Sequence, residues 1–208
     1  MATNKTVFFL IGILLIVIGI FMLATYSMQL MYQENSHSFV SSSFITIFIG
    51  VLFILSNLDK EFRLTLRQTF LFSTLAWVMV AIFGSLPFIL SPKEFSFSEA
   101  FFESMSGITT TGSTVISNLD ETPKSILMWR AIMQWLGGVG IIVMATTVLP
   151  LLKVGGMQVF KTDSSEAEKL LPKTIEVASV IILIYTTLTF SCMTVYWLHG
   201  MSIFDSIA

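Results

Sequence analysis

Five long apolar runs, separated by short polar stretches, constrain this chain more than any other feature. A helix needs about 20 apolar residues, each adding about 1.5 Å, to cross the hydrocarbon core of a bilayer. The runs that reach or approach this length are residues 6–28, 42–58, 70–90, 126–152 and 175–198. With 54% hydrophobic and 12% charged residues, and a mean hydropathy of +0.85, the composition excludes an ordinary soluble domain. We therefore predict an all-α polytopic membrane protein.

The positively charged residues alternate between the polar stretches. Cytoplasmic connections retain Lys and Arg during membrane insertion. Every second connection carries them, namely Lys5, then Lys60, Arg63 and Arg67, then Lys153, Lys161, Lys169 and Lys173. The connection at residues 29–41 has none, and the one at 91–125 has two lysines against five acidic residues. The pattern predicts a cytoplasmic N-terminus and places residues 91–125 on the outer side.

This outer connection contains a segment, FSFSEAFFESMSG, that is too apolar for a loop in water. Ser96 and Glu99 have the spacing of a capping box, in which each side chain bonds a backbone N–H of the other residue. The spacing predicts a short helix that runs to Ser106 and is ended by Gly107. About ten residues cover only about half of a bilayer, so the helix would enter the membrane without crossing it.

The next residues, ITTTGSTV at 108–115, would then lie at membrane depth. Irregular backbone is stable there only where it is buried in protein or lines a water-filled cavity. A row of backbone carbonyls can replace the water around a potassium ion, threonine hydroxyls can add oxygens, and a glycine permits positive φ. The C-terminal end of the preceding helix carries a partial negative charge that favours a cation. We interpret the segment as pore-lining backbone; the alternative is a Ser/Thr-rich surface turn.

The same pattern begins again near residue 200. After the fifth apolar run, Ser202 and Asp205 repeat the spacing of Ser96 and Glu99. This predicts a second short helix, within which the 208 residues stop. We expect a truncated product or the front part of a longer chain, inactive in transport by itself.

Four segments occur in a fixed order, FFESMSGITTTGSTV, WRAIMQWLGGVGIIVMA, LPLLKVGGMQVFKTD and GMSIFDSIA. Together they resemble the TrkH family within the Trk/Ktr/HKT superfamily of potassium transporters. The resemblance implies fused units of span, pore helix, filter and span around one pore. It divides the chain into an extra N-terminal transmembrane helix pair (1–62), a first pore unit (63–155), a cytoplasmic connector (156–173) and the incomplete start of a second pore unit (174–208).

The resemblance also implies a function, potassium uptake across the bacterial cytoplasmic (inner) membrane, either down the electrochemical gradient or by symport. The selectivity filter would be Thr109, Thr110, Thr111 and Gly112, flanked by Ser113, with potassium bound by backbone and hydroxyl oxygens of Thr110 and Thr111. With one glycine and no aromatic residue, this filter should select less strictly against sodium than the filter of tetrameric potassium channels. Potassium is the transported substrate, and we expect no organic cofactor and no enzyme activity.

The partners implied by the resemblance are the lipid bilayer, a TrkA-like cytoplasmic nucleotide-binding regulatory subunit, and a second copy of the full-length chain in a homodimer. No nucleic-acid partner is expected. The loop at 153–173 mixes apolar and charged residues, and the resemblance implies that it meets the regulatory subunit; the residues alone favour an ordinary connector. The alternative function is a nonconducting membrane subunit or scaffold.

Two charged residues fall in apolar surroundings. Glu103 follows Glu99 by one helical turn, and it either attracts cations to the pore mouth or forms a structural salt bridge. Arg130 lies in the fourth apolar run, where an unpaired charge is costly. We expect it to pair with Glu103 or with a filter carbonyl; a direct role in transport is the alternative. The glycines of GGVG, at 137–140, are predicted to allow close helix packing or to act as a hinge.

Overall fold

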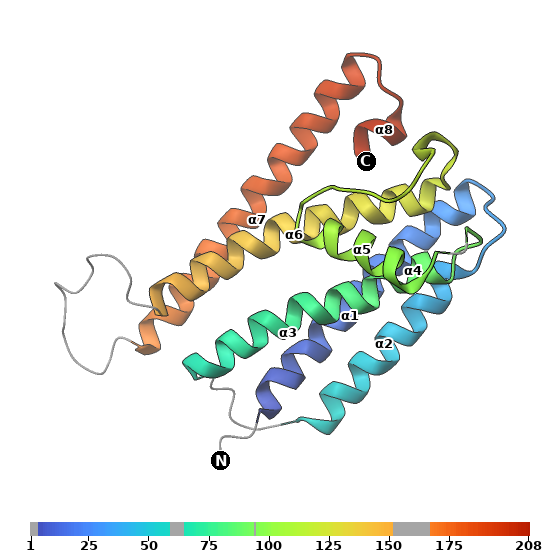
Figure 1. Ribbon diagram of the computed structural model, residues 1–208. Helices are drawn as coiled ribbons and strands as arrows, with labels where there is room; N and C mark the ends of the chain where they lie inside the picture. The colour runs from blue at the N-terminus through green and yellow to red at the C-terminus, as the bar shows by residue number, and fades with distance from the viewer. Residues whose placement is uncertain (1–3, 59–64, 94, 152–166) are drawn as a thin grey trace. The chain divides into compact units, whose positions relative to one another are not determined.

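The computed structural model describes residues 4–58, 65–93, 95–151 and 167–208. All regular structure in these ranges is helical, and five helical stretches are long and apolar enough to cross a membrane. These are α1 (Lys5–Met31), α2 (Ser38–Ser56), α3 (Leu66–Gly84) with α4 (Leu86–Ile89), α6 (Lys124–Leu151) and α7 (Ala167–Leu198). The shorter elements are α5 (Phe97–Ile108), a 3-10 helix (Leu119–Glu121) and α8 (Ile203–Ile207) (Figure 1). The predicted all-α membrane fold is confirmed.

The helix ends differ from the predicted runs because polar residues at the ends of a run can stay helical outside the hydrocarbon. The largest difference is at α7, which begins at Ala167, within the stretch 156–173 that was expected to be a connector. Its first residues, AEKLL, are strong helix formers. Residues 156–166 of that connector lie outside the described residues. By its contacts the chain divides into two compact units, Met1–Gly137 and Gly138–Ala208.

In the first unit, α1 and α2 pack side by side as an antiparallel hairpin (Figure 1). A Cβ added to Gly12 would lie 2.7 Å from the carbonyl oxygen of Gly50, and one added to Gly50 would lie 2.8 Å from that of Gly12. Farther along, the Ser43 hydroxyl donates to the Gly19 carbonyl at 2.7 Å. Helices in lipid gain little from apolar burial against each other, so close backbone approach at small residues is what holds them together.

The third apolar run is broken into α3 and α4. Pro87 has no N–H to continue the helical bonding, and the Phe88 N–H bonds the Ser85 carbonyl instead. The change of bonding leaves the carbonyl of Gly84 free, and the indole N–H of Trp129 donates to it at 2.9 Å. The predicted single span at 70–90 therefore contains a break whose freed acceptor is satisfied by α6.

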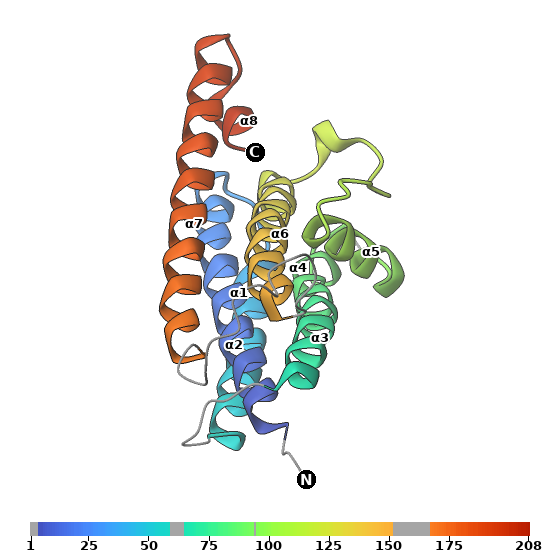
Figure 2. The ribbon, with the colours of Figure 1, turned by 90° about the vertical axis from the view of Figure 1, so that its left-hand side faces the viewer.

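The main core of the first unit is formed by residues of α1, α2, α3, α4, α5 and the beginning of α6, helices that are drawn in Figure 2. Phe39 of α2 meets Trp129 of α6 edge to face, with ring centroids 6.1 Å apart. Ile108 and Ile116 belong to the same core. Since these two residues flank the exposed stretch 109–115, the core anchors that stretch at both ends.

In the second unit, a left-handed glycine follows the end of α7, and α8 begins three residues after that glycine. Gly200 has φ +96°, and the Met201 N–H bonds the Tyr196 carbonyl in a Schellman motif. Ser202 then caps α8, as the repeated spacing predicted, with φ −60° and ψ 154°. The corresponding angles at Ser96, the cap of α5, are −60° and 156°.

Candidate ion-binding site

The short helix α5 starts at the predicted capping box. The Ser96 hydroxyl accepts from the Glu99 N–H at 3.3 Å, and the Ser96 backbone N–H donates to the Glu99 carboxylate at 2.9 Å. The Ser96 hydroxyl also donates to this carboxylate at 2.6 Å. These bonds, the hydroxyl bond first, hold the pKa of Glu99 below its ordinary value. The 12 residues of α5 span about 18 Å, about half of a bilayer.

The end of α5 corrects the prediction that Gly107 terminates the helix. The helix continues to Ile108 and closes with a Schellman motif, in which the Thr111 N–H bonds the Ser106 carbonyl at 3.0 Å and the Thr110 N–H bonds the Gly107 carbonyl at 2.9 Å. The left-handed residue is Thr110, with φ 58°. A β-branched residue is unfavourable in this conformation, so the backbone is strained at the centre of the predicted filter.

Gly107 is needed for packing instead. A Cβ at this position would lie 3.0 Å from the Cβ of Met133 in α6. One at Gly137 would lie 1.9 Å from the carbonyl oxygen of Ile108. In the second unit, a Cβ at Gly138 would meet the Tyr185 hydroxyl at 2.4 Å. The predicted packing role of the GGVG glycines is confirmed for Gly137 and Gly138.

Residues 109–113, here called the filter segment, expose a run of backbone oxygens. In the part of the chain that the structure describes, the carbonyls of Thr109, Thr110, Thr111 and Gly112 accept no hydrogen bond, and all four residues are exposed. Gly112 has φ +76°, the positive angle that its position predicted. Four consecutive carbonyls thus remain available to a cation.

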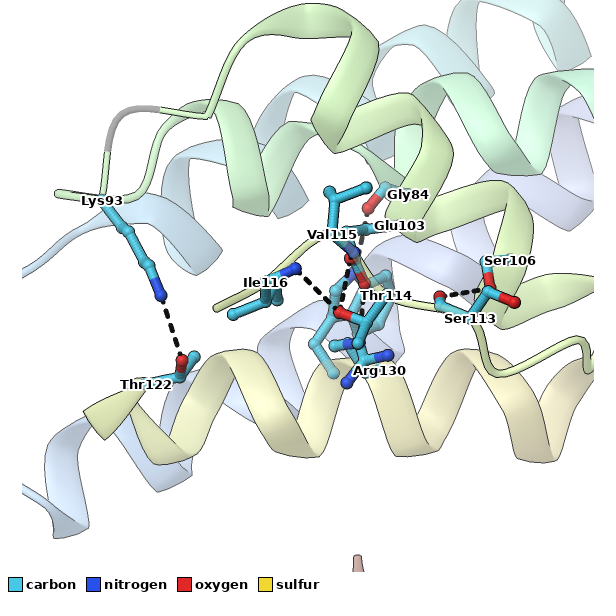
Figure 3. A network of polar contacts seen from close by, with 11 residues as sticks. Gly84, Lys93, Glu103, Ser106, Ser113, Thr114, Val115, Ile116, Thr122 and Arg130 are labelled. Atoms are coloured by element: carbon cyan, nitrogen blue, oxygen red, sulfur yellow. Dashed lines mark hydrogen bonds and ion pairs between the residues drawn. The ribbon is translucent and has the colours of Figure 1, made fainter. Parts of the chain in front are cut away.

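Two hydroxyls of the filter segment meet beside these carbonyls. The Thr109 hydroxyl donates to the Met105 carbonyl at 2.7 Å, and the hydroxyl oxygens of Thr109 and Thr111 are 2.9 Å apart. Because the proton of Thr109 is used, Thr111 is the donor between them. Ser113 differs, since its carbonyl accepts the Ser106 hydroxyl at 2.6 Å. Ser113 therefore anchors the segment to α5, as Figure 3 shows.

The carboxylate of Glu103 holds the chain that leaves the filter segment. Its Oε1 accepts from the Thr114 hydroxyl at 2.7 Å and from the Val115 N–H at 2.6 Å. Its Oε2 lies 2.8 Å from Nε of Arg130, an ion pair without hydrogen-bond alignment. Glu103 is only 1% exposed. A buried carboxylate whose charge is balanced by Arg130 is poorly placed to attract cations. The geometry therefore favours the alternative that Glu103 forms a structural salt bridge (Figure 3).

A lysine holds the loop between α5 and α6 at a point farther from the filter segment. Nζ of Lys93 donates to the Ser117 carbonyl at 3.1 Å. It also donates to the Thr122 hydroxyl at 3.3 Å, the bond drawn in Figure 3. Sequence reasoning missed this lysine and the anchors Ser106, Thr114 and Trp129. In the sequence, the only sign of these roles is a hydroxyl or indole group within an apolar segment, and such a group does not show which residue it contacts. In the described ranges, no group of three or more His, Cys, Asp and Glu side chains is arranged to hold a metal ion.

The chain is similar to proteins of the Trk system. The family model TrkH, described as cation transport protein, matches residues 35–206. The Trk system potassium uptake protein TrkH of Vibrio parahaemolyticus is 38% identical over 98% of this chain and 43% of its own length. TrkH of Escherichia coli is 36% identical over 95% of this chain and 42% of its own length.

A solved structure agrees with these matches. The crystal structure of the potassium transporter TrkH from Vibrio parahaemolyticus superimposes with a TM-score of 0.86 at 38% identity, covering 98% of this chain and 41% of that chain. This chain thus spans about two fifths of the length of the relatives it matches. Since the family model covers most of its residues, the chain belongs to the TrkH family of cation transport proteins.

Proposed function

We propose that this chain supplies one filter segment of a potassium-conducting pore in the bacterial inner membrane. The observation that carries the proposal is the run of four exposed residues, 109–112, whose carbonyls accept no hydrogen bond from the residues that the structure describes. Such oxygens can replace the hydration shell of potassium without burying a fixed charge. The similar proteins of Vibrio parahaemolyticus and Escherichia coli are named as potassium uptake proteins.

The supports of the filter segment fit this role. The C-terminal end of α5, with its partial negative charge, adjoins the segment and favours a cation there. Ser113 and Glu103 fix the chain beyond the carbonyls, so the oxygens need little rearrangement when an ion enters. We propose that Thr110 and Thr111 bind the ion through carbonyl oxygens and that the Thr111 hydroxyl contributes a further oxygen.

One filter segment does not surround an ion. A closed pore needs further segments, from additional sequence or from other copies. We propose the division implied by the resemblance, with residues 1–62 as an extra helix pair, 63–155 as the first pore unit, 156–173 as a cytoplasmic connector and 174–208 as the start of a second unit. The matching backbone angles of Ser96 and Ser202 support the repeat.

The proposed orientation has the N-terminus in the cytoplasm, because the Lys and Arg residues gather in alternate connections. Glu34 of the α1–α2 connection contacts Ser125, the second residue of α6, and this contact supports a position of the connection on the same side of the membrane as the filter segment. Docking of a TrkA-like regulatory subunit and homodimerisation of the full-length protein are proposed from family membership.

The test is rubidium flux into proteoliposomes, competed by potassium and sodium. Two proteins are compared, the 208-residue chain and a chimera in which this chain replaces the matching part of Vibrio parahaemolyticus TrkH. We expect selective flux from the chimera and none from the chain alone. Gly112→Asp should abolish the flux, whereas Gly112→Asn, which tolerates the same positive φ without a charge, should retain part of it. A well-folded chimera without flux would favour the scaffold alternative.

A further inference from the structure

A carboxylate of the α1–α2 connection caps the helix that follows the filter segment. Oε1 of Glu34 accepts from the Ser125 backbone N–H at 3.1 Å, and Oε2 accepts from the Ser125 hydroxyl. Ser125 is the second residue of α6 and is 1% exposed. The first N–H groups of a helix have no partner within it and carry a partial positive charge. Glu34 satisfies one of these groups with a negative charge.

Glu34 itself is held in place by the end of α1. The Gln33 N–H bonds the Leu30 carbonyl at 3.2 Å, and the Glu34 N–H bonds the Gln29 carbonyl at 3.0 Å, which together form a Schellman motif with Gln33 at φ 52°. The Gln29 amide donates to the Ser38 hydroxyl at 3.1 Å, joining α1 to the start of α2. The carboxylate therefore projects from a connection that is fixed at both ends.

Further contacts lead from Ser125 along α6 toward the filter segment. Trp129 lies one turn after Ser125, and it also meets the helix pair through its edge-to-face contact with Phe39. The next residue, Arg130, pairs with Glu103, whose other oxygen holds Thr114 and Val115. A continuous series of contacts thus leads from the α1–α2 connection to the chain that leaves the filter segment.

On the basis of the proposed function, we propose that Glu34 is a positioning residue for the ion filter. It sets the position of α6, and through Arg130 and Glu103 it fixes the filter segment. The α1–α2 pair then acts as a brace on the outer side of the first pore unit. Glu34 does not touch the ion in this role; its removal loosens the filter segment while the helices remain folded.

The first test is hydrogen exchange of the 208-residue chain in lipid nanodiscs, which needs no transport. The reporting amides are Thr111, which bonds Ser106, and Val115, which bonds Glu103. Glu34→Gln should speed their exchange about tenfold by raising the population of the loosened segment. Ser125→Ala, which keeps the backbone bond, should act in the same direction with a smaller effect. Ser125→Ala also provides the test if Glu34→Gln folds poorly.

The matched control is Glu121→Gln, an exposed acid four residues before Ser125 that does not contact it. This variant should leave exchange at 111 and 115 unchanged. Faster exchange of Glu34→Gln confined to residues around 34 and 125 would show a local helix cap only and would overturn the proposal. Equal exchange in all variants would also overturn it.

The second test measures flux in the chimera with Vibrio parahaemolyticus TrkH. Glu34→Gln should lower the preference for rubidium over sodium at unchanged protein abundance, a change that would not follow if Glu34 only stabilised the start of α6. If the exchange at 111 and 115 changes but no variant carries flux, the positioning role stands and the proposed function fails. If flux is selective and insensitive to Glu34, the positioning role fails alone.

Discussion

Glu103 of α5 and Arg130 of α6 form a buried ion pair, with Oε2 and Nε 2.8 Å apart, at the point where the chain leaves the filter segment. The carboxylate side chain is fully buried and the guanidinium side chain is 12% exposed. Taking both charges out of water is costly, and the two additional hydrogen bonds from Thr114 and Val115 offset part of that cost. Together these contacts join α5, α6 and the chain that follows the filter segment, which lie apart in the sequence.

Removing one member of this pair should destabilise the protein strongly. Arg130→Met leaves the Glu103 charge buried without its partner, and we expect a loss of about 3 kcal/mol in the free energy of unfolding. Chemical unfolding in detergent measures it. The double variant Glu103→Gln with Arg130→Met should lose less than the sum of the single variants. Additive losses would mean that the two residues act independently.

The Gly137 position should not accept a side chain. A Cβ there would lie 1.9 Å from the Ile108 carbonyl oxygen, so Gly137→Ala must push α6 away from the end of α5. We expect a loss of about 1–3 kcal/mol in unfolding experiments. Gly140→Ala is the matched control, because no atom of the described residues lies within 4 Å of a Cβ there, and alanine should stabilise the helix by up to about 1 kcal/mol. Equal effects at both positions would contradict the packing role.

The left-handed conformation of Thr110 should be relieved by glycine. At φ 58°, Thr110→Gly removes the clash of a β-branched side chain and should raise the free energy of unfolding by about 1 kcal/mol. The same change at Thr109, where φ is −81°, should lower it, since no strain is relieved and the hydroxyl bond to Met105 is lost. Destabilisation by Thr110→Gly would show that this threonine is not strained.

The capping box of α5 should weaken in acid. The pKa of Glu99 is lowered from its ordinary value of 4.5, chiefly by the Ser96 hydroxyl. The stabilisation is therefore complete above the unfolded pKa and is lost as the pH falls through the lower, folded pKa. NMR titration of the Glu99 carboxyl should show a higher pKa in Ser96→Ala than in the unchanged chain. Identical titration curves for the two proteins would show that the Ser96 hydroxyl does not lower the pKa of Glu99.

Several features of the site followed from local patterns. The capping box at Ser96, the N-cap at Ser202 and the positive φ of Gly112 depend on neighbouring residues, and all three were predicted correctly. The end of α5 was predicted wrongly at Gly107, because a glycine near a helix end indicates either a left-handed cap or a close contact. Only the approach of Met133 distinguishes the two.

The sequence by itself determined that the chain is a helical membrane protein, because the length of an apolar run against the thickness of the hydrocarbon core is a property of one segment alone. The tertiary structure decided which polar groups meet. Glu34 and Ser125 are 91 residues apart, and Trp129 reaches Gly84 only because Pro87 breaks the helix there. Such contacts depend on how the helices pack, and buried polar groups take whichever partner that packing brings within hydrogen-bond distance.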